Sequence, residues 1–236
     1  MHDNSWFVTL TYETPPYGNT LVRSHPSKFI RSLRKRTGQK WRYFVAGEYG
    51  EQFSRPHYHL ILFGPALPDL RFVYEREGNN YFSSDLLTDA WGRGLVDVTT
   101  VSPSVMMYVT KYHVDKVNGD RASDHYLWLV EDTGELITRE PEFALMSNRP
   151  GIGATWFDQY WSDCYPKGFV TSAGIRYRPP RYYDLLLERS DPELFERVKA
   201  ERLLNLPSLA ETLQDRLDAK AACALAELEL KIGRRL

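Results

Sequence analysis

The sequence is poor in cysteine and has no long apolar run. Its 236 residues include two cysteines, Cys164 and Cys223, whose spacing fits neither a disulfide framework nor a metal-binding pattern. This favours a protein that works in a reducing compartment. No apolar stretch approaches the ~18–20 residues of a membrane-spanning helix, and the N-terminal segment does not have the pattern of a signal peptide. We therefore expect no membrane association.

The chain also lacks a glycine-rich loop ending in Gly-Lys-Ser or Gly-Lys-Thr, and it lacks an excess of charge of either sign. Without that loop, no ATPase or helicase domain is predicted. The net charge of −1 leaves the class of partner open, but the basic residues are unevenly placed. Between Arg23 and Arg42 there are many basic residues and no acidic one, which is compatible with a phosphate-binding face and equally with a solvated helix surface.

Alternation of apolar and polar residues predicts strands, and helical spacing between breaker residues predicts helices. Strands are expected at 6–12, 41–48, 57–64 and 95–101, and helices at 24–38, 84–91, 103–117 and 191–204. The loop between the second and third strands is short, so these two are predicted to be antiparallel neighbours. The elements predict an α+β fold with a mainly antiparallel central sheet, packed helices and a helical C-terminal extension.

Two histidines begin the strand expected at 57–64. Alternate side chains of a strand share a face, so His57 and His59 point the same way, about 7 Å apart. Glu48 ends the strand expected beside them, which brings a carboxylate near the two imidazoles. Glu51 in the connecting loop is the alternative carboxylate, and Glu48 is preferred because a strand end holds a ligand more rigidly.

Two imidazoles and a carboxylate with open coordination positions suit a divalent metal. Mg²⁺ or Mn²⁺ fits such a set when phosphate oxygens of a substrate complete the coordination. The other interpretation is a pair of half-exposed histidines on a sheet face, with no metal. The histidine strand by itself does not decide between the two.

The helix expected at 103–117 has two tyrosines four residues apart. Tyr108 and Tyr112 therefore share one helix face, Lys116 extends the same row and Lys111 lies on its flank. Tyrosines that cover the sheet with their hydroxyl groups in water are the alternative. Because other residues of this helix supply apolar side chains, including Val109, the tyrosine row need not be the core face.

In this order the motifs resemble those of the HUH rolling-circle replication initiators. They are a strand with threonines at 7–12, the Gly47-Glu48 strand end, Pro56-His57-Tyr58-His59 and Tyr108-Val109-Thr110-Lys111-Tyr112. The tyrosine pair resembles the two-tyrosine branch of the superfamily. The segments 147–153, 165–166 and 179–184 resemble C-terminal parts of the initiators of gokushovirus-like Microviridae, which are single-stranded DNA phages.

The resemblance implies an HUH endonuclease fold and a metal-dependent enzyme that nicks and rejoins single-stranded origin DNA. Tyr108 and Tyr112 match the nucleophiles, while Glu48, His57 and His59 match the ligands of Mg²⁺ or Mn²⁺. Attack would give a 5′-phosphotyrosine and a free 3′-OH that primes rolling-circle replication. The second tyrosine would allow one chain to release a circle.

The resemblance also implies further residues and partners. Lys111 and Lys116 match lysines that flank the nucleophiles, and DNA contacts are expected from Arg31, Arg34, Lys35, Arg36, Lys40 and Arg42. A host helicase and DNA polymerase are the expected partners, in the cytoplasm of a bacterial host cell. His113 and Asp115 depart from the pattern, since less ionisable residues are expected there. The alternatives are an HUH transposase or relaxase, or a non-catalytic nucleic-acid-binding protein.

Three regions are expected along the chain. Residues 1–120 would form the endonuclease core, 121–190 a family-specific aromatic and proline-rich segment packed on the core, and 191–236 a helical tail. The tail has an apolar stripe formed by Leu209, Leu213, Leu217, Ala221, Leu225, Leu228 and Ile232. This stripe fits a helix docked on its own domain, and it also fits a dimer or partner helix. The sequence leaves the oligomeric state open.

Overall fold

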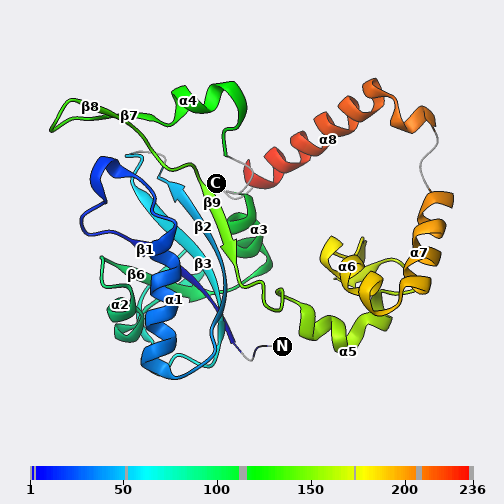
Figure 1. The fold of residues 1–236 in the computed structure, drawn as a ribbon, viewed down its shortest axis with the longest axis horizontal. Coiled ribbons are helices and arrows are strands. Elements are labelled where there is room, and N and C mark those ends of the chain that lie inside the picture. Colours follow the sequence, from blue (N-terminus) through cyan, green and yellow to red (C-terminus); the bar gives the residue numbers. More distant parts are fainter. Residues whose placement is uncertain are drawn as a thin grey trace. The chain divides into compact units, whose positions relative to one another are not determined.

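The computed structural model describes residues 2, 4–50, 53–111, 116–172, 174–205 and 209–233. They fall into two compact units, Met1–Ile152 and Gly153–Leu236. Figure 1 shows the helices and strands of both units along the chain. No helix of the described residues is long and apolar enough to cross a membrane.

A seven-stranded sheet of order β4-β5-β6-β1-β3-β2-β9 forms the centre of the first unit. Its strands are β1 (Asn4–Thr11), β2 (Arg42–Tyr49), β3 (Pro56–Gly64), β4 (Arg71–Arg76), β5 (Asn79–Ser83), β6 (Val96–Thr100) and β9 (Phe143–Met146). Each neighbouring pair is antiparallel. The predicted α+β fold with an antiparallel central sheet is confirmed, and the histidine strand β3 lies inside the sheet between β1 and β2.

The β4–β5 hairpin and strand β9 are larger than or absent from the sequence prediction. We expect mostly loop at 65–80, with a short strand at 71–74, because this segment is polar. The structure instead has a tight hairpin whose turn residues Glu77 and Gly78 both have positive φ, at 52° and 72°. Every residue of β4 is exposed, so burial leaves no alternating pattern to find in the sequence.

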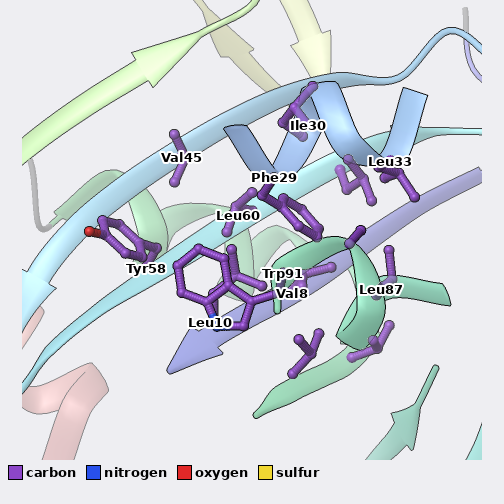
Figure 2. Close-up of a cluster of buried hydrophobic side chains, with 14 of the residues drawn as sticks. Val8, Leu10, Phe29, Ile30, Leu33, Val45, Tyr58, Leu60, Leu87 and Trp91 are labelled. Atoms are coloured by element: carbon purple, nitrogen blue, oxygen red, sulfur yellow. The ribbon is translucent and has the colours of Figure 1, made fainter. Parts of the chain in front are cut away.

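One face of the sheet is covered by α1 (Ser24–Thr37) and α2 (Asp85–Trp91). Phe29 and Leu33 of α1 and Trp91 of α2 pack on Leu10 and Leu60 of the sheet, and all are almost completely buried (Figure 2). Glycines in the left-handed conformation end both helices, as their positions in the sequence predict, and Ser84 caps the start of α2. These helices form the main core of the unit.

Trp91→Ala should lower the free energy of unfolding by about 3–5 kcal/mol. The indole is fully buried, its ring contacts Tyr12, Phe29 and Tyr58, and its Nε1–H donates to the Thr11 carbonyl at 2.7 Å. Urea unfolding measures the change. Trp161→Ala removes an indole that is 40% exposed and serves as the control. A loss no larger than that of the control would contradict this role of Trp91 in the core.

The opposite face of the sheet is covered in part by α3 (Pro103–Lys111), which packs on β2 and β3. Val109 is fully buried there against Ala46 and Ile61. The predicted helix to 117 is too long. Residues 112–115 lie outside the described residues, and Lys116 is not helical, because the chain leaves the helix before Val117 donates its N–H to the Tyr126 hydroxyl at 3.1 Å.

The rest of the first unit follows α3 and leads into β9. It contains the short elements η2 (Gly119–Arg121) and α4 (Ala122–His125) and a separate hairpin of β7 (Leu127–Val130) and β8 (Glu135–Thr138). A further 3-10 turn, η1 (Tyr17–Asn19), follows β1. Because β9 pairs with β2, the residues up to 152 belong to this unit.

The second unit has its own hydrophobic core. It contains α5 (Ala154–Cys164), β10 (Val170–Ser172), β11 (Ile175–Tyr177), α6 (Arg181–Ser190), α7 (Pro192–Leu204), η3 (Leu209–Thr212) and α8 (Gln214–Gly233). Phe157, Leu187 and Val198 bring α5, α6 and α7 into one cluster. The structural division after Ile152 thus differs from the boundaries at 120 and 190 that composition suggests.

The C-terminal extension is helical, as predicted. Asp191 caps α7 by accepting a hydrogen bond from the Leu194 N–H at 2.9 Å, with Pro192 in the first turn. The apolar stripe of the tail is exposed at Leu213, Leu217 and Leu225. Its role as a docking or partner surface stays a prediction.

Candidate metal centre

Glu48 on β2 and the two histidines of β3 form a compact cluster on the α3 side of the sheet. The strand register places Glu48 directly opposite His57. Glu48 Oε1 lies 2.6 Å from His57 Nε2 and 2.8 Å from His59 Nε2, and the potential ligand atoms of the three residues all lie within 4.8 Å of one another. The structure therefore brings together the triad that the sequence suggested. Glu51, the alternative carboxylate, lies outside the described residues.

Burial makes this cluster demanding for the protein. Glu48 is 5% exposed and His59 7%, whereas His57 is nearer to solvent. The second carboxylate oxygen, Glu48 Oε2, is buried and has no hydrogen-bond partner among the described residues. An unpaired buried carboxylate oxygen costs free energy, and a bound cation would satisfy it. The donor set thus fits a divalent metal.

The pKa values of the cluster follow from competition between burial and pairing. Burial alone would raise the pKa of the Glu48 carboxyl, but its hydrogen bonds with His57 and His59 outweigh burial and leave it below the ordinary value. For His57, burial opposes protonation, yet the Glu48 carboxylate raises the imidazole pKa. The pKa of the more deeply buried His59 is lowered by burial. Protons and a metal would therefore compete for the same three atoms.

The far nitrogens of both imidazoles are held by groups outside the triad. His57 Nδ1 lies 3.1 Å from the Arg55 carbonyl, and His59 Nδ1 lies 3.1 Å from the Thr9 hydroxyl. A carbonyl only accepts, so His57 Nδ1 carries the proton and a neutral ring presents the Nε2 lone pair to the triad. The Phe7 ring stacks on His59 at 5.2 Å.

Thr9 and Phe7 support His59, and neither was predicted to do so from the sequence. Thr9 is directly opposite His59 in the β1–β3 register, so both side chains point to the same face. Strand alternation could have found this contact only after the register of β1 on β3 was known. The threonines at 7–12 were the available signal.

Tyr108 lies beside the triad. It precedes the buried anchor Val109 on α3, and its ring centroid is 5.5 Å from that of His59. The Tyr108 side chain is 46% exposed, so its position is open to a ligand as well as close to the histidines. Of the other residues predicted for this helix, Tyr112 and the Lys111 side chain lie outside the described part of the structure.

Lys116 lies in another setting from the one predicted. Instead of extending a helical row with Tyr108, it lines a cavity together with Asn118, Arg121, Asp124 and His125. The cavity walls come from the segment between α3 and β7. A role for Lys116 at the triad stays a prediction.

The basic side of α1 is separated from the triad by the sheet. The apolar side of α1 packs with Tyr58 and Leu60, whose side chains alternate along β3 with those of His57 and His59. This helix has the cations Arg31, Arg34, Lys35 and Arg36. All of them are exposed, but a DNA strand bound at the triad would have to pass around the sheet to reach them.

Lys40 and Arg42 follow α1. Lys40 is exposed, whereas Arg42 begins β2 on the same face as the triad and donates to the carbonyls of Ser147 and Pro150. Arg42 is six residues from Glu48 along the strand, which corresponds to about 20 Å. The structure therefore does not gather the predicted DNA-binding cations at the triad.

Comparison with known proteins gives one family and several phage relatives. Residues 5–117 match the model of the ORF2 family of replication-associated proteins. Replication-associated protein VP4 of Bdellovibrio phage phiMH2K is 26% identical over 92% of this chain and 68% of its own length. Replication-associated protein ORF2 of Spiroplasma virus 4 is 30% identical, with coverages of 84% and 63%.

A third relative, replication-associated protein ORF4 of Chlamydia phage 1, is 26% identical over 80% of this chain. The chain spans 47% of that protein, so these relatives extend beyond the region that they share with it. No solved structure gives a significant match.

Proposed function

We propose that this chain, which belongs through residues 5–117 to the ORF2 family of replication-associated proteins, nicks and rejoins single-stranded DNA at a replication origin. The observation that carries the proposal is the position of Tyr108 beside the Glu48–His57–His59 triad. A nucleophile next to a set of metal ligands is the arrangement that phosphoryl transfer to a side chain requires. The phage relatives, all replication-associated proteins, support the same conclusion.

Glu48, His57 and His59 would hold Mg²⁺ or Mn²⁺. When bound, such a metal polarises the scissile phosphate and offsets charge that develops on its oxygens. The protein contributes orientation: Thr9 and the Arg55 carbonyl fix the imidazole rings from behind. Burial of Glu48 keeps the carboxylate in one place.

Tyr108 acts as the nucleophile. Its phenolic oxygen attacks the phosphorus, the bond from phosphorus to the 3′ oxygen breaks, the phenol loses its proton and the departing 3′ oxygen gains one. The products are a 5′-phosphotyrosine and a free 3′-OH. The phosphoester bond is retained, so a 3′-OH can later attack the phosphotyrosine and rejoin the strand without ATP. Tyr112 would serve as the second nucleophile, and Lys111 and Lys116 would offset charge on the phosphate.

The free 3′-OH defines the partners that the reaction needs. A DNA polymerase must extend it, and a helicase must separate the strands ahead of the polymerase. We assign both to the host, in the cytoplasm of a bacterial cell, since the relatives come from phages and a virus of bacteria. The substrate is origin DNA in single-stranded form.

The polarity of the nick tests the proposed function. Incubation of the protein with a single-stranded origin and Mn²⁺ should give one fragment whose 3′-OH a polymerase extends. The other fragment should resist end-labelling by polynucleotide kinase after phosphatase treatment, because its 5′ end is bound to protein. EDTA should prevent both products. A freely labelled 5′ end would indicate hydrolysis and contradict the proposal.

Thr9→Val should weaken the binding of Mn²⁺ by roughly 10- to 100-fold, because it removes the hydroxyl that orients His59. Valine keeps the branched shape that suits a strand. Isothermal titration with Mn²⁺ measures the affinity. Thr9→Ser keeps a hydroxyl and should bind nearly as well as the wild type. Equal affinities of Thr9→Val and Thr9→Ser would show that the hydroxyl does not support the site.

A further inference from the structure

We propose that Tyr74 and Tyr81 of the β4–β5 hairpin form a stacking platform for unpaired DNA bases, on the same sheet face as the metal triad. The ligand class rests on the proposed function, and the platform adds the surface that would hold bases next to the cleavage site. Neither residue belongs to the triad or to the helix that bears the nucleophile.

The strand register places the platform on the face of the triad. Directly opposite residues of antiparallel strands share a face. Opposite pairs run from the hairpin inward: Tyr74 with Tyr81, Tyr81 with Thr99, and Thr99 with Phe7. The row ends at the triad, because the Phe7 ring stacks on His59.

The two tyrosine rings are arranged for stacking. Their centroids are 4.6 Å apart and their planes differ by 11°. Tyr74 is 40% exposed and lies on β4, the edge strand of the sheet, whose residues are all exposed. A base that stacks on a ring already held by its neighbour pays little ordering entropy, and every base has a π-face to offer.

This half of the sheet face is accessible. Helix α3 packs over β2 and β3 through Val109, whereas Asp97 of β6, on the same face as the triad, is exposed. Three strand spacings separate β1 from β4, which is about 14 Å. A single strand with one phosphate beside Tyr108 could therefore lay nearby bases over β6 and β5 to reach the two tyrosines.

The charge around the platform favours bases over phosphates. Arg76 and Asp97 act on Tyr74 with opposite sign, and Arg71 is paired with Asp85. A groove that tracked the phosphate backbone would have an excess of cations and a strong dependence on salt. The platform should instead contribute affinity that depends little on salt and is absent for duplex DNA, whose bases are already stacked on each other.

Fluorescence anisotropy with labelled oligo(dT) tests the platform. Measured on the full chain in EDTA, which prevents cleavage, Tyr74→Ala should raise the Kd roughly 5- to 100-fold without changing its salt dependence. Tyr74→Phe keeps the ring and should bind nearly as well as the wild type. Phe72→Ala is the matched control, because Phe72 is 60% exposed on the same strand but faces the α1 side. A Tyr74→Ala Kd equal to that of Phe72→Ala would overturn the proposal.

A second measurement does not depend on a folded variant. An oligonucleotide containing 5-iododeoxyuridine should crosslink on irradiation to the hairpin segment 71–83 of the wild-type protein. Crosslinks only elsewhere would overturn the proposal. So would a change of oligomeric state, without a change of Kd, in Tyr74→Ala, since an exposed edge strand can also pair with a second copy of the chain.

The test separates the platform from the proposed function. If the wild type forms a covalent DNA adduct while Tyr74→Ala binds oligo(dT) like the wild type, the platform is wrong and the nicking activity stands. If no adduct forms under any condition and Tyr74→Ala still weakens binding, the platform stands and the nicking activity is wrong.

Discussion

Glu48→Gln should abolish the binding of Mn²⁺ and reduce nicking of single-stranded DNA on the order of 1000-fold. Glu48 is the residue that both histidines meet, through Oε1 at 2.6 and 2.8 Å, and its second oxygen is buried without a partner among the described residues. Glutamine keeps the shape of the side chain but removes the charge that a divalent cation requires. The loss of several kcal/mol of charge stabilisation corresponds to a rate effect of this size.

Titration with Mn²⁺ and nicking assays measure the two effects. Circular dichroism must show that Glu48→Gln is folded, because removing one partner of a buried charged cluster also destabilises a protein. Glu75→Gln is the control, since Glu75 is an exposed carboxylate of the same sheet. Nicking by Glu48→Gln at the rate of Glu75→Gln would mean that the triad is structural.

The variant with both Tyr108→Phe and Tyr112→Phe should form no covalent DNA adduct, with nicking reduced by at least roughly 10³-fold. Phenylalanine keeps the Tyr108 ring near His59 and removes only the attacking oxygen. Metal affinity and stability should therefore be close to those of the wild type, which separates a chemical role from a packing role.

The single variants assign the order of the two tyrosines. Because Tyr108 lies beside the triad, Tyr108→Phe alone should lose most of the first cleavage, whereas Tyr112→Phe should retain it and lose release of circles. Gel electrophoresis in denaturant detects the adduct of each variant. Tyr177→Phe changes an exposed tyrosine of the second unit and should behave as the wild type. An undiminished adduct in the double variant would exclude these phenols as nucleophiles.

Local patterns sufficed for the triad because its geometry is short in sequence. His57 and His59 share a face through alternation, and a tight connection pairs β2 with β3 so that Glu48 meets His57. The contacts of Thr9 needed the register between strands about fifty residues apart, which no local pattern specifies. The sequence thus predicted the ligands but not the residues that orient them.

The position of the basic helix shows a second limit of local patterns. The apolar residues Phe29, Ile30 and Leu33 predict which side of α1 is buried, and that side is buried. They do not predict which face of the sheet the helix covers. That choice depends on the connections between strands, and it places the α1 cations away from the triad.

The β4–β5 hairpin is a third case. Exposure on both sides removes the alternation by which strands are recognised, and only the Glu77-Gly78 turn could have indicated it. Its two stacked tyrosines became meaningful only when the register placed them in line with Phe7 and His59.

Mass spectrometry of the trapped adduct is the most direct test of the central claim, that a tyrosine beside the triad attacks the phosphate. Trypsin cleaves after Lys111, so Tyr108 falls in the peptide 94–111 and Tyr112 in the peptide 112–116. After nuclease digestion, we expect a nucleotide bound through phosphate to the 94–111 peptide in the first cleavage. Cleaved DNA with no nucleotide on either peptide would contradict the claim.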